Sequence, residues 1–331
     1  MLSSNKESFE NLLFKNLSEK EFADMAVQLF HFQYNNNSIY QQYCNHLKID
    51  PQEIQSIYDI PFLPVSFFKT HNIATTKFTP EIIFTSSGTT GMQNARHLVK
   101  NLALYTRSFL ESFKFFYGDP AEYTFLCLLP GYMEREGSSL IYMMDYLVKN
   151  SKNSDSGFFL YNHEDLYNQL QKQQRNSEKV ILFGVSFALI DFAEKYTLDF
   201  PELIVFETGG MKGRRKELVK EELHAILQQS FGVPAIHSEY GMCELLSQAY
   251  SKGNNTFASP PWMKLLLRDE KDPLLVDPEL NSGMINIIDF ANIYSCAFIA
   301  TDDLGKRKQT GLEIIGRTDN SEIRGCNLLV L

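Results

Sequence analysis

Apolar positions near the start of the chain recur at helical spacing, as Phe22, Met25 and Leu29 show, and this periodicity predicts helices. The polar run 35–38 predicts a break between two of them. The proline-flanked segment 61–65 predicts an extended, buried crossing into the rest of the chain, because a residue before proline is biased away from the helical region.

The middle of the chain alternates short apolar runs with amphipathic segments. Strands are predicted at 82–84, 124–129, 180–183, 203–206 and 233–236. Helices are predicted at 102–116, at 140–147 behind a cap at Ser138 and Ser139, and near 187–196 and 214–229. Strands that alternate with helices in this way predict an α/β fold, a mainly parallel sheet with helices on both faces.

The pattern changes after Pro261, where strands follow one another without a strong helix between them. They are predicted at 265–267, 284–290, 294–301 and 312–315. We find no repeat and no long linker, and therefore expect a single domain over residues 1–331. Its parts are a helical lead-in at 1–60, an α/β core at 61–260 and a β-rich part with a C-terminal tail at 261–331.

Composition narrows the function. Hydrophobic residues make up 44% and charged residues 21%, and the net charge of -9 gives no general attraction to nucleic acid or an anionic membrane. No apolar run approaches the roughly 18 residues of a membrane span, and the start lacks the apolar core of a signal peptide. The five cysteines form no C-x-x-C pair, which argues against a disulfide framework and structural zinc. We expect a reduced, cytoplasmic protein.

A run rich in hydroxyl groups and glycine directly follows the predicted strand at 82–84. It consists of Thr85, Ser86, Ser87, Gly88, Thr89, Thr90 and Gly91. Its glycines let the backbone turn sharply and present N–H groups to an anion, and its hydroxyls add donors. The lysine of a P-loop is absent. We predict that this loop holds the β- and γ-phosphates of ATP.

Three further segments, 238–244, 301–305 and 316–319, stand in a fixed order behind this loop. They resemble the Y-G-x-T-E, T-G-D and G-R-x-x-D motifs of the adenylate-forming superfamily, which includes acyl-CoA synthetases, luciferases and peptide-synthetase adenylation domains. The resemblance implies the large N-terminal-type domain of that superfamily. It also implies that the protein uses ATP and Mg²⁺ to activate a carboxylic acid as its acyl-AMP.

The resemblance assigns roles to single residues. Tyr240 would stack on adenine, Asp302 would bind the ribose hydroxyls, and Arg317 would contact the ribose or the phosphates. Glu244 would be catalytic by ligating Mg²⁺, since a carboxylate beside a triphosphate needs a cation that neutralises both. The rest of the motif at the nucleotide consists of Glu239, Gly241, Met242 and Cys243.

A second glycine-containing loop follows the strand predicted at 203–206. It resembles the superfamily loop that runs along adenine, and its predicted contacts are Gly209, Gly210, Met211 and Lys212. Lys212 also opens a basic cluster with Arg214, Arg215 and Lys216 at a predicted helix N-terminus, where the helix dipole disfavours cations. The pattern favours a solvated basic face slightly over a phosphate site.

Two positions depart from the superfamily pattern. Cys243 stands where threonine is usual, and Asn94-Ala95-Arg96-His97 replaces the Pro-Lys that usually follows the phosphate loop. We predict that Arg96 substitutes for the missing lysine. Both departures bear on the rate rather than on the type of reaction.

The chain ends fifteen residues past Gly316, where most of the superfamily continues into a small C-terminal domain, so we expect that domain to be absent. This architecture resembles the bacterial acyl-protein synthetases of bioluminescence systems. The segments that carry the likeness are 61–65, 129–140, 208–214 and 322–326. The resemblance implies that a long-chain fatty acid becomes acyl-AMP and then passes to a protein thiol, Cys326.

Cys326 suits this role chemically, because a thiolate attacks a mixed anhydride readily and Arg324 would lower the pKa of the thiol. A small buried hydrophobe is the alternative reading of the cysteine. A near-terminal position beside glycine favours the acyl acceptor.

Other readings of the whole chain remain open. One is an acyl- or aryl-CoA ligase that borrows its small domain from another chain, and another is a pseudoenzyme that binds nucleotide or acyl groups. The 26 phenylalanines suit an apolar substrate pocket and an ordinary core equally. These readings leave open a fatty or another carboxylic acid as the substrate, and a reductase, a carrier protein or CoA as the downstream acceptor.

Overall fold

A computed structural model describes residues 9–10, 12–86, 93–130, 137–209 and 218–317. The N-terminal part is helical, as predicted, with α2 (Glu19–Asn36) and α3 (Ser38–His46). Asn37 separates them, and its side chain accepts a hydrogen bond from the Tyr40 N–H and so caps α3. The predicted break at 35–38 is confirmed.

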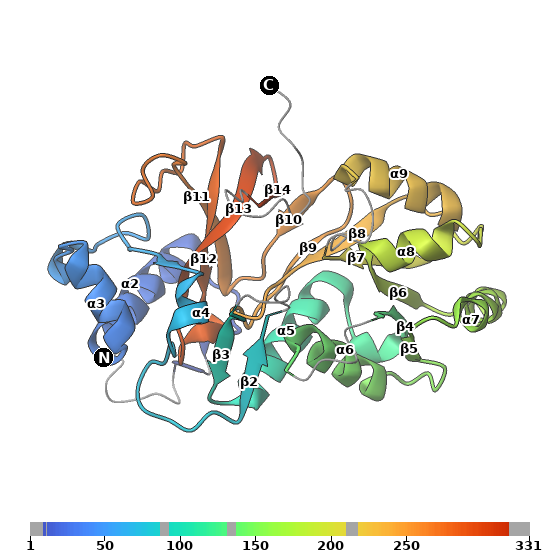
Figure 1. Cartoon of the computed structure of the whole chain (residues 1–331), viewed down its shortest axis with the longest axis horizontal. Helices are drawn as coiled ribbons and strands as arrows, with labels where there is room; N and C mark the ends of the chain where they lie inside the picture. The colour runs from blue at the N-terminus through green and yellow to red at the C-terminus, as the bar shows by residue number, and fades with distance from the viewer. Residues whose placement is uncertain (1–8, 11, 87–92, 131–136, 210–217, 318–331) are drawn as a thin grey trace.

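A mixed sheet of twelve strands crosses the whole molecule in the order β11-β12-β13-β14-β10-β9-β8-β7-β6-β4-β5, with β1 paired to β13 (Figure 1). Its parallel half consists of β4 (Thr124–Leu128), β5 (Gly157–Phe159), β6 (Val180–Val185), β7 (Ile204–Thr208) and β8 (Ile236–Tyr240). The other half is antiparallel and consists of β9 (Ala249–Ser251), β10 (Thr256–Ala258), β11 (Met263–Arg268), β12 (Ser282–Asp289), β13 (Phe298–Lys308) and β14 (Gly311–Arg317). The predicted fold class is confirmed, with the antiparallel half making the sheet mixed.

Helices cover the parallel half on both faces. Figure 1 shows α8 (Ser186–Ala193) and α9 (Lys220–Phe231) on one side of β6–β8, and α5 (Leu102–Tyr117) and α6 (Ser139–Asn150) on the other. Ser138 caps α6 by accepting a hydrogen bond from the Ile141 N–H, as predicted. Other elements are the helices α4 (Phe67–Thr70) and α7 (His163–Arg175), the short strand β1 (Leu63–Pro64) and the hairpin of β2 (Ile82–Thr85) and β3 (Arg96–Val99).

Several element boundaries differ from the sequence prediction. The strand expected at 233–236 begins at Ile236 and runs to Tyr240, because Pro234 has no N–H to donate to a strand ladder. The strand expected at 294–301 begins at Phe298, since Asp289 accepts a hydrogen bond from the Ala291 N–H and starts a 3-10 turn there. Within the described residues, the last helix starts at Lys220.

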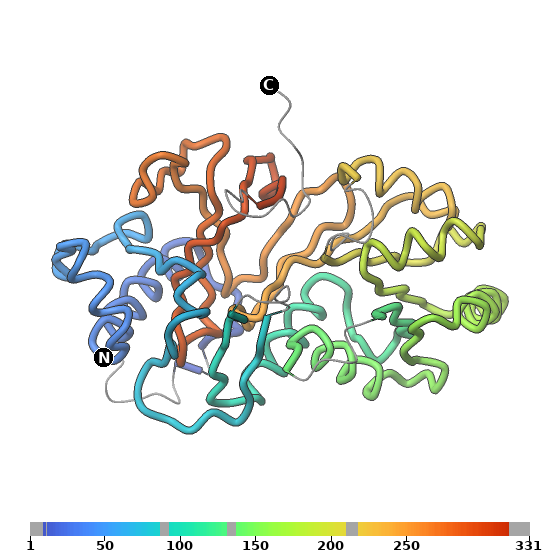
Figure 2. Tube along the Cα trace, viewed as in Figure 1, coloured from blue at the N-terminus to red at the C-terminus, as the bar shows by residue number. Residues whose placement is uncertain are grey.

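The N-terminal helices pack on the antiparallel half, and Figure 2 traces them beside β11–β13, at the opposite end of the sheet from β4 and β5. Phe22 stacks on Phe290 at a centroid distance of 4.4 Å. The buried Gln33 amide donates to the carbonyl oxygens of Asn292 and Ile293. This end of the molecule therefore holds the lead-in in place, away from the ends of the parallel strands. No helix in the described part of the chain is long and apolar enough to cross a bilayer.

Candidate active site

The phosphate loop starts from a hairpin. Its first two residues, Thr85 and Ser86, lie at the end of β2, where the Thr85 N–H donates to the Gly137 carbonyl at 2.8 Å. The Ser86 N–H donates to the Ala95 carbonyl at 3.1 Å, and the Ala95 N–H donates to Ser86 Oγ at 2.9 Å. These bonds fix the stem of the loop. The predicted contacts Ser87, Gly88, Thr89, Thr90 and Gly91 lie outside the described residues.

Three of the predicted motifs meet at one carboxylate, that of Asp303. The Tyr240 hydroxyl donates to Asp303 Oδ2 at 2.7 Å, and Arg317 Nε donates to Asp303 Oδ1 at 3.1 Å. Asp303 is only 5% exposed. It pairs with Arg317 across β13 and β14, while Tyr240 ends β8. Strand β8 and the β13–β14 hairpin, which are distant in the sequence, thus build one polar cluster.

The cluster sets the charge of its members. Burial raises the pKa of Tyr240, and the nearby charge of Asp303 raises it further. The same carboxylate raises the pKa of Arg317 against the effect of burial. Tyr240 therefore stays neutral and Arg317 stays charged at physiological pH. A neutral ring beside an anion–cation pair is a suitable surface for a nucleoside.

Asp302, the predicted ribose ligand, is not part of this cluster. Successive residues of a strand point to opposite faces, and along β13 Asp303 is buried while Asp302 is exposed. Asp302 lies instead within electrostatic range of Arg268. In a T-G-D motif the acidic residue is the third one, and in Thr301-Asp302-Asp303 this is Asp303. The structure thus brings together Tyr240, Asp303 and Arg317.

Glu244, the predicted magnesium ligand, is 6% exposed. Burial raises the pKa of its carboxyl group, and a hydrogen bond with Cys243 and the charges of Arg317 and Lys69 oppose the rise only in part. In the described ranges, no group of three His, Cys, Asp or Glu side chains gathers to cage a metal. A lone buried carboxylate fits Mg²⁺ that arrives on phosphates, since Mg²⁺ is usually held by one or two carboxylates plus phosphate oxygens and water.

The cysteines of the described part are poor nucleophiles. Cys44, Cys127, Cys243 and Cys296 are all buried, and burial raises the pKa of each thiol. For Cys243 the neighbouring Glu244 charge adds to the rise. A thiol with a raised pKa carries little of the reactive thiolate. Cys326 and Arg324 lie outside the described residues.

The segment after the phosphate loop contains a residue that the motifs did not reveal, His97. Its Nδ1 lies 2.8 Å from the Cys243 carbonyl and its Nε2 lies 2.9 Å from Ser295 Oγ. Burial lowers the pKa of His97 to about 4, so the ring is neutral and links β3 to the Glu244 segment. Buried positions alternate along β3 at His97 and Val99. This alternation is the sequence signal that could have identified His97 as a buried residue. Arg96, the predicted substitute cation, is exposed opposite Thr85.

The second predicted loop begins at the end of β7. Gly209 has a φ of 69°, a left-handed conformation that favours glycine. Its carbonyl lies 2.9 Å from Ser186 Oγ. Gly210, Met211, Lys212 and the rest of the basic cluster (Arg214, Arg215 and Lys216) lie outside the described residues.

The end of β8 is crowded beside the motif. Glu239 accepts a hydrogen bond from Thr208 Oγ1 at 2.8 Å, and any side chain at Gly241 would collide with the Glu239 carboxylate. Met242 is partly buried. Burial raises the pKa of Glu239 to about 7, with Thr208 opposing the rise and the charge of Glu207 adding to it.

Glu207, at the end of β7, is a buried carboxylate with several polar partners. Burial alone would raise its pKa, but the ion pair with Lys220 and the hydrogen bonds from His224 and Ser238 lower it to about 2. The side chain is therefore charged although it is only 3% exposed. The sequence motifs assigned Glu207 no role.

Comparison with known proteins finds similarity to ligases. The family described as acyl-protein synthetase, LuxE, matches residues 12–116. Proteins named long-chain-fatty-acid–luciferin-component ligase are 24% identical to the chain. The Aliivibrio fischeri protein matches over 94% of this chain and 88% of its own length, and the Vibrio harveyi protein over 94% and 87%.

Solved structures share the fold. A 2-hydroxyisobutyryl-CoA ligase in the postadenylation state, in complex with 2-HIB-AMP, aligns with a TM-score of 0.62 at 12% identity, over 90% of this chain and 67% of its own. ATP-bound MatB from Rhodopseudomonas palustris aligns with a TM-score of 0.53 at 16% identity, over 73% of this chain. The match spans half of the MatB chain. These likenesses confirm the adenylate-forming fold.

Proposed function

Since the chain is a relative of the acyl-protein synthetases with the fold of adenylate-forming enzymes, we propose that it is a ligase that uses ATP to activate a long-chain fatty acid as acyl-AMP. It then transfers the acyl group to a protein thiol. The observation that carries the proposal is the Tyr240–Asp303–Arg317 cluster, in which three separate motifs converge. The names of the curated relatives and their coverage of 94% of the chain agree with it.

Each member of the cluster has a task in nucleotide binding. The ring of Tyr240 stacks on adenine, and the two oxygens of Asp303 accept hydrogen bonds from the ribose hydroxyls. Asp303 takes the role that the motif reading gave to Asp302. Arg317 holds Asp303 through Nε, and its guanidinium carries further donors for the ribose or the α-phosphate.

The phosphates lie against the loop of residues 85–91, with Arg96 beside its stem. Glu244 would hold the Mg²⁺ that accompanies ATP, and this ion would neutralise charge on the phosphates. The burial of Glu244 keeps water away from the carboxylate and strengthens its interaction with a cation.

Two transfers follow from this arrangement. The fatty-acid carboxylate attacks the α-phosphorus of ATP, and pyrophosphate leaves as acyl-AMP forms. The thiolate of Cys326 then attacks the acyl carbon, AMP leaves, and a thioester forms. The described cysteines are buried with raised pKa values, which supports Cys326 as the nucleophile. A free thiol that works with ATP suits a reducing compartment such as the cytoplasm.

The first test is ATP–pyrophosphate exchange with Mg²⁺ across a panel of fatty, short-chain and aromatic acids. We expect exchange that depends on a long-chain acid. Exchange with an aromatic acid alone would change the substrate class, and no exchange with any acid would favour the pseudoenzyme reading.

The second test is covalent labelling with radiolabelled fatty acid and ATP. Wild type should acquire a hydroxylamine-sensitive label, and Cys326→Ala should lose the label while keeping exchange. Cys127→Ala, at a buried cysteine of β4 outside the nucleotide motifs, is the matched control and should still label. A wild-type chain that never labels but makes acyl-CoA from free CoA would replace the acyl-protein reading with the CoA ligase.

A further inference from the structure

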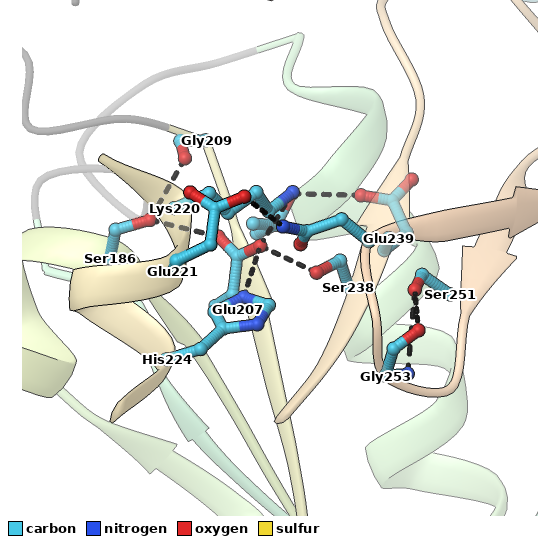
Figure 3. A network of polar contacts seen from close by, with 12 residues as sticks. Ser186, Glu207, Gly209, Lys220, Glu221, His224, Ser238, Glu239, Ser251 and Gly253 are labelled. Carbon is cyan, nitrogen blue, oxygen red and sulfur yellow. Dashed lines mark hydrogen bonds and ion pairs between the residues drawn. The ribbon is translucent and has the colours of Figure 1, made fainter. Parts of the chain in front are cut away.

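Glu207 lies inside a ring of polar side chains from three other elements (Figure 3). Ser186 on α8 donates to Glu207 Oε2 at 3.0 Å, and Ser238 on β8 donates to Oε1 at 2.6 Å. From α9, Lys220 Nζ lies 2.9 Å and His224 Nε2 lies 3.5 Å from Oε1. One carboxylate thus joins the end of β7 to β8 and to both helices that cover this face.

The ring adjoins two of the predicted adenine contacts, Gly209 and Tyr240. Gly209 follows Glu207 by two residues, and its carbonyl lies 2.9 Å from the same Ser186 hydroxyl that binds Glu207. Ser238 precedes Tyr240 by two residues on β8, and Glu207 and Ser238 are register partners across the two strands. The separation of Gly209 from Tyr240 is therefore set through Glu207.

Lys220 extends the network towards Tyr240 by a second path. Its ammonium group lies 2.9 Å from Glu207 and 4.8 Å from the centre of the Phe257 ring. Phe257 in turn meets Tyr240 edge to face, with centroids 6.1 Å apart. The cation thus lies between the carboxylate and an aromatic ring that supports Tyr240 on the side of β10.

Stability alone does not account for this arrangement. A buried ion pair contributes little net stability compared with apolar residues of similar volume, although removing one partner is costly. What a fully hydrogen-bonded carboxylate adds is direction, because each of its partners is held at a fixed distance and angle. The contacts of Glu207 therefore fix the ends of β7 and β8, and both strands lead into the nucleotide site.

We propose that Glu207 is a positioning residue for ATP, which holds Gly209 and Tyr240 at the separation that adenine requires. This inference rests on the proposed function. It assigns Glu207 no contact with substrate, and Lys220 acts by holding the carboxylate in its ionised, oriented form. Loss of the arrangement should weaken ATP binding and leave the acyl chemistry intact.

The test compares ATP and fatty-acid kinetics in the exchange assay, alongside calorimetric titration with ATP and Mg²⁺. Glu207→Gln preserves the shape of the side chain but removes the charge that binds Lys220. We expect the KM for ATP to rise about tenfold, with kcat and the KM for the fatty acid within about twofold of wild type. A rise in KM at constant kcat is the signature of lost binding that ground state and transition state share.

Gln173→Met is the matched control. Gln173 is fully buried on α7, and its side chain hydrogen-bonds Asn153 and Asp155. Asn153 in turn contacts Thr124 at the start of β4, whereas Glu207 and Tyr240 lie near the ends of β7 and β8. This variant loses buried hydrogen bonds without touching the nucleotide site. Its KM for ATP should equal that of wild type.

A second pair of variants tests the same proposal if Glu207→Gln does not fold. Lys220→Arg keeps the cation and should hold the KM for ATP within about threefold, whereas Lys220→Met should raise it about tenfold. Equal behaviour of the two Lys220 variants, or a loss of kcat at constant KM in Glu207→Gln, would overturn the positioning role.

The outcomes separate this inference from the proposed function. If wild type exchanges and Glu207→Gln binds ATP normally, only the positioning role falls. If wild type neither binds ATP nor catalyses exchange, this result alone contradicts the proposed function, and the inference about Glu207 is wrong as well.

Discussion

Glu207 and Glu239 lie near the ends of neighbouring strands, yet they occupy opposite faces of the sheet. Glu207 faces α8 and α9, where Lys220 and two serine hydroxyls bind it. Glu239 lies on the face that α5 covers and accepts from Thr208. The first has its pKa lowered to about 2 and the second has its pKa raised to about 7, although burial raises the pKa of both.

The difference shows that burial alone does not set the charge of a carboxyl group. A cation and several donors favour the ionised form, whereas a single hydroxyl cannot offset the loss of water. The same division holds in the rest of the site. Asp303 has the Arg317 cation at 3.1 Å, while Glu244 is buried with a raised pKa. The site thus contains carboxylates that are paired with a cation of the protein, and carboxylates whose pKa is raised by burial.

The largest expected effect concerns Glu244, a carboxylate whose pKa is raised by burial. If it ligates Mg²⁺, Glu244→Gln should lower exchange by about a thousandfold or more, because an amide cannot neutralise the ion. The fold should persist, since the substitution replaces a buried group of raised pKa by a neutral one. The measurement is exchange at saturating Mg²⁺, with circular dichroism of the variant. Unchanged exchange in a folded protein would remove Glu244 from the metal site.

The second prediction compares stability at the two glutamates. Glu207→Gln should lower the free energy of unfolding by about 3 kcal/mol, because it leaves Lys220 without its buried partner. Glu239→Gln should change it by less than about 1 kcal/mol at pH 7, since this side chain is partly protonated there. Urea unfolding measures both. The double variant Glu207→Gln with Lys220→Met should recover part of the loss, and equal effects at both glutamates would contradict the comparison.

The third prediction concerns Asp303 and its neighbour. Asp303→Asn should raise the KM for ATP by about tenfold to a hundredfold, because it weakens the contacts to Arg317 and to the ribose. Asp302→Asn is the control on the same strand, and its exposed side chain should leave the KM for ATP within about twofold. ATP titrations in the exchange assay measure both, and the reverse ranking would restore the original assignment of Asp302.

This pair of residues also shows how far the sequence could be read. The motif predicts a ribose ligand at Asp302, and the choice between Asp302 and Asp303 depends on which face of β13 is buried. That face is decided by the pairing of β13 with β12 and β14. A single sequence does not reveal the register of such pairings. Tyr240 and Glu244 could be proposed from the sequence because their motif is contiguous in the chain.

Partners brought together by the fold were harder to predict. Glu207 binds Ser186, Lys220 and Ser238 from three other elements. Each of these residues taken alone reads as an ordinary cap or surface position. Long, strongly periodic segments such as α5 and β4 were predicted almost to the residue. The strand predicted at 233–236 begins only at Ile236, because Pro234 has no N–H to donate to the ladder.

The smallest expected effect is a pH dependence that arises at Glu239 and not at Glu207. The folded-state pKa of Glu239, about 7, lies above its usual value of 4.5, so the folded protein binds more protons than the unfolded chain between these values. Its contribution to stability should therefore fall as pH rises from about 4.5 to about 7 and then level off. For Glu207 the folded pKa is about 2, so its stabilisation is complete above about 4.5 and is lost only as pH falls towards 2.

Between pH 5 and 8, wild type should thus lose on the order of 1 kcal/mol relative to Glu239→Gln, given that Glu239 is only partly buried. Urea unfolding of both proteins at several pH values measures this difference. If the unfolding free energies of the two proteins change in parallel with pH, Glu239 does not titrate between pH 5 and 8.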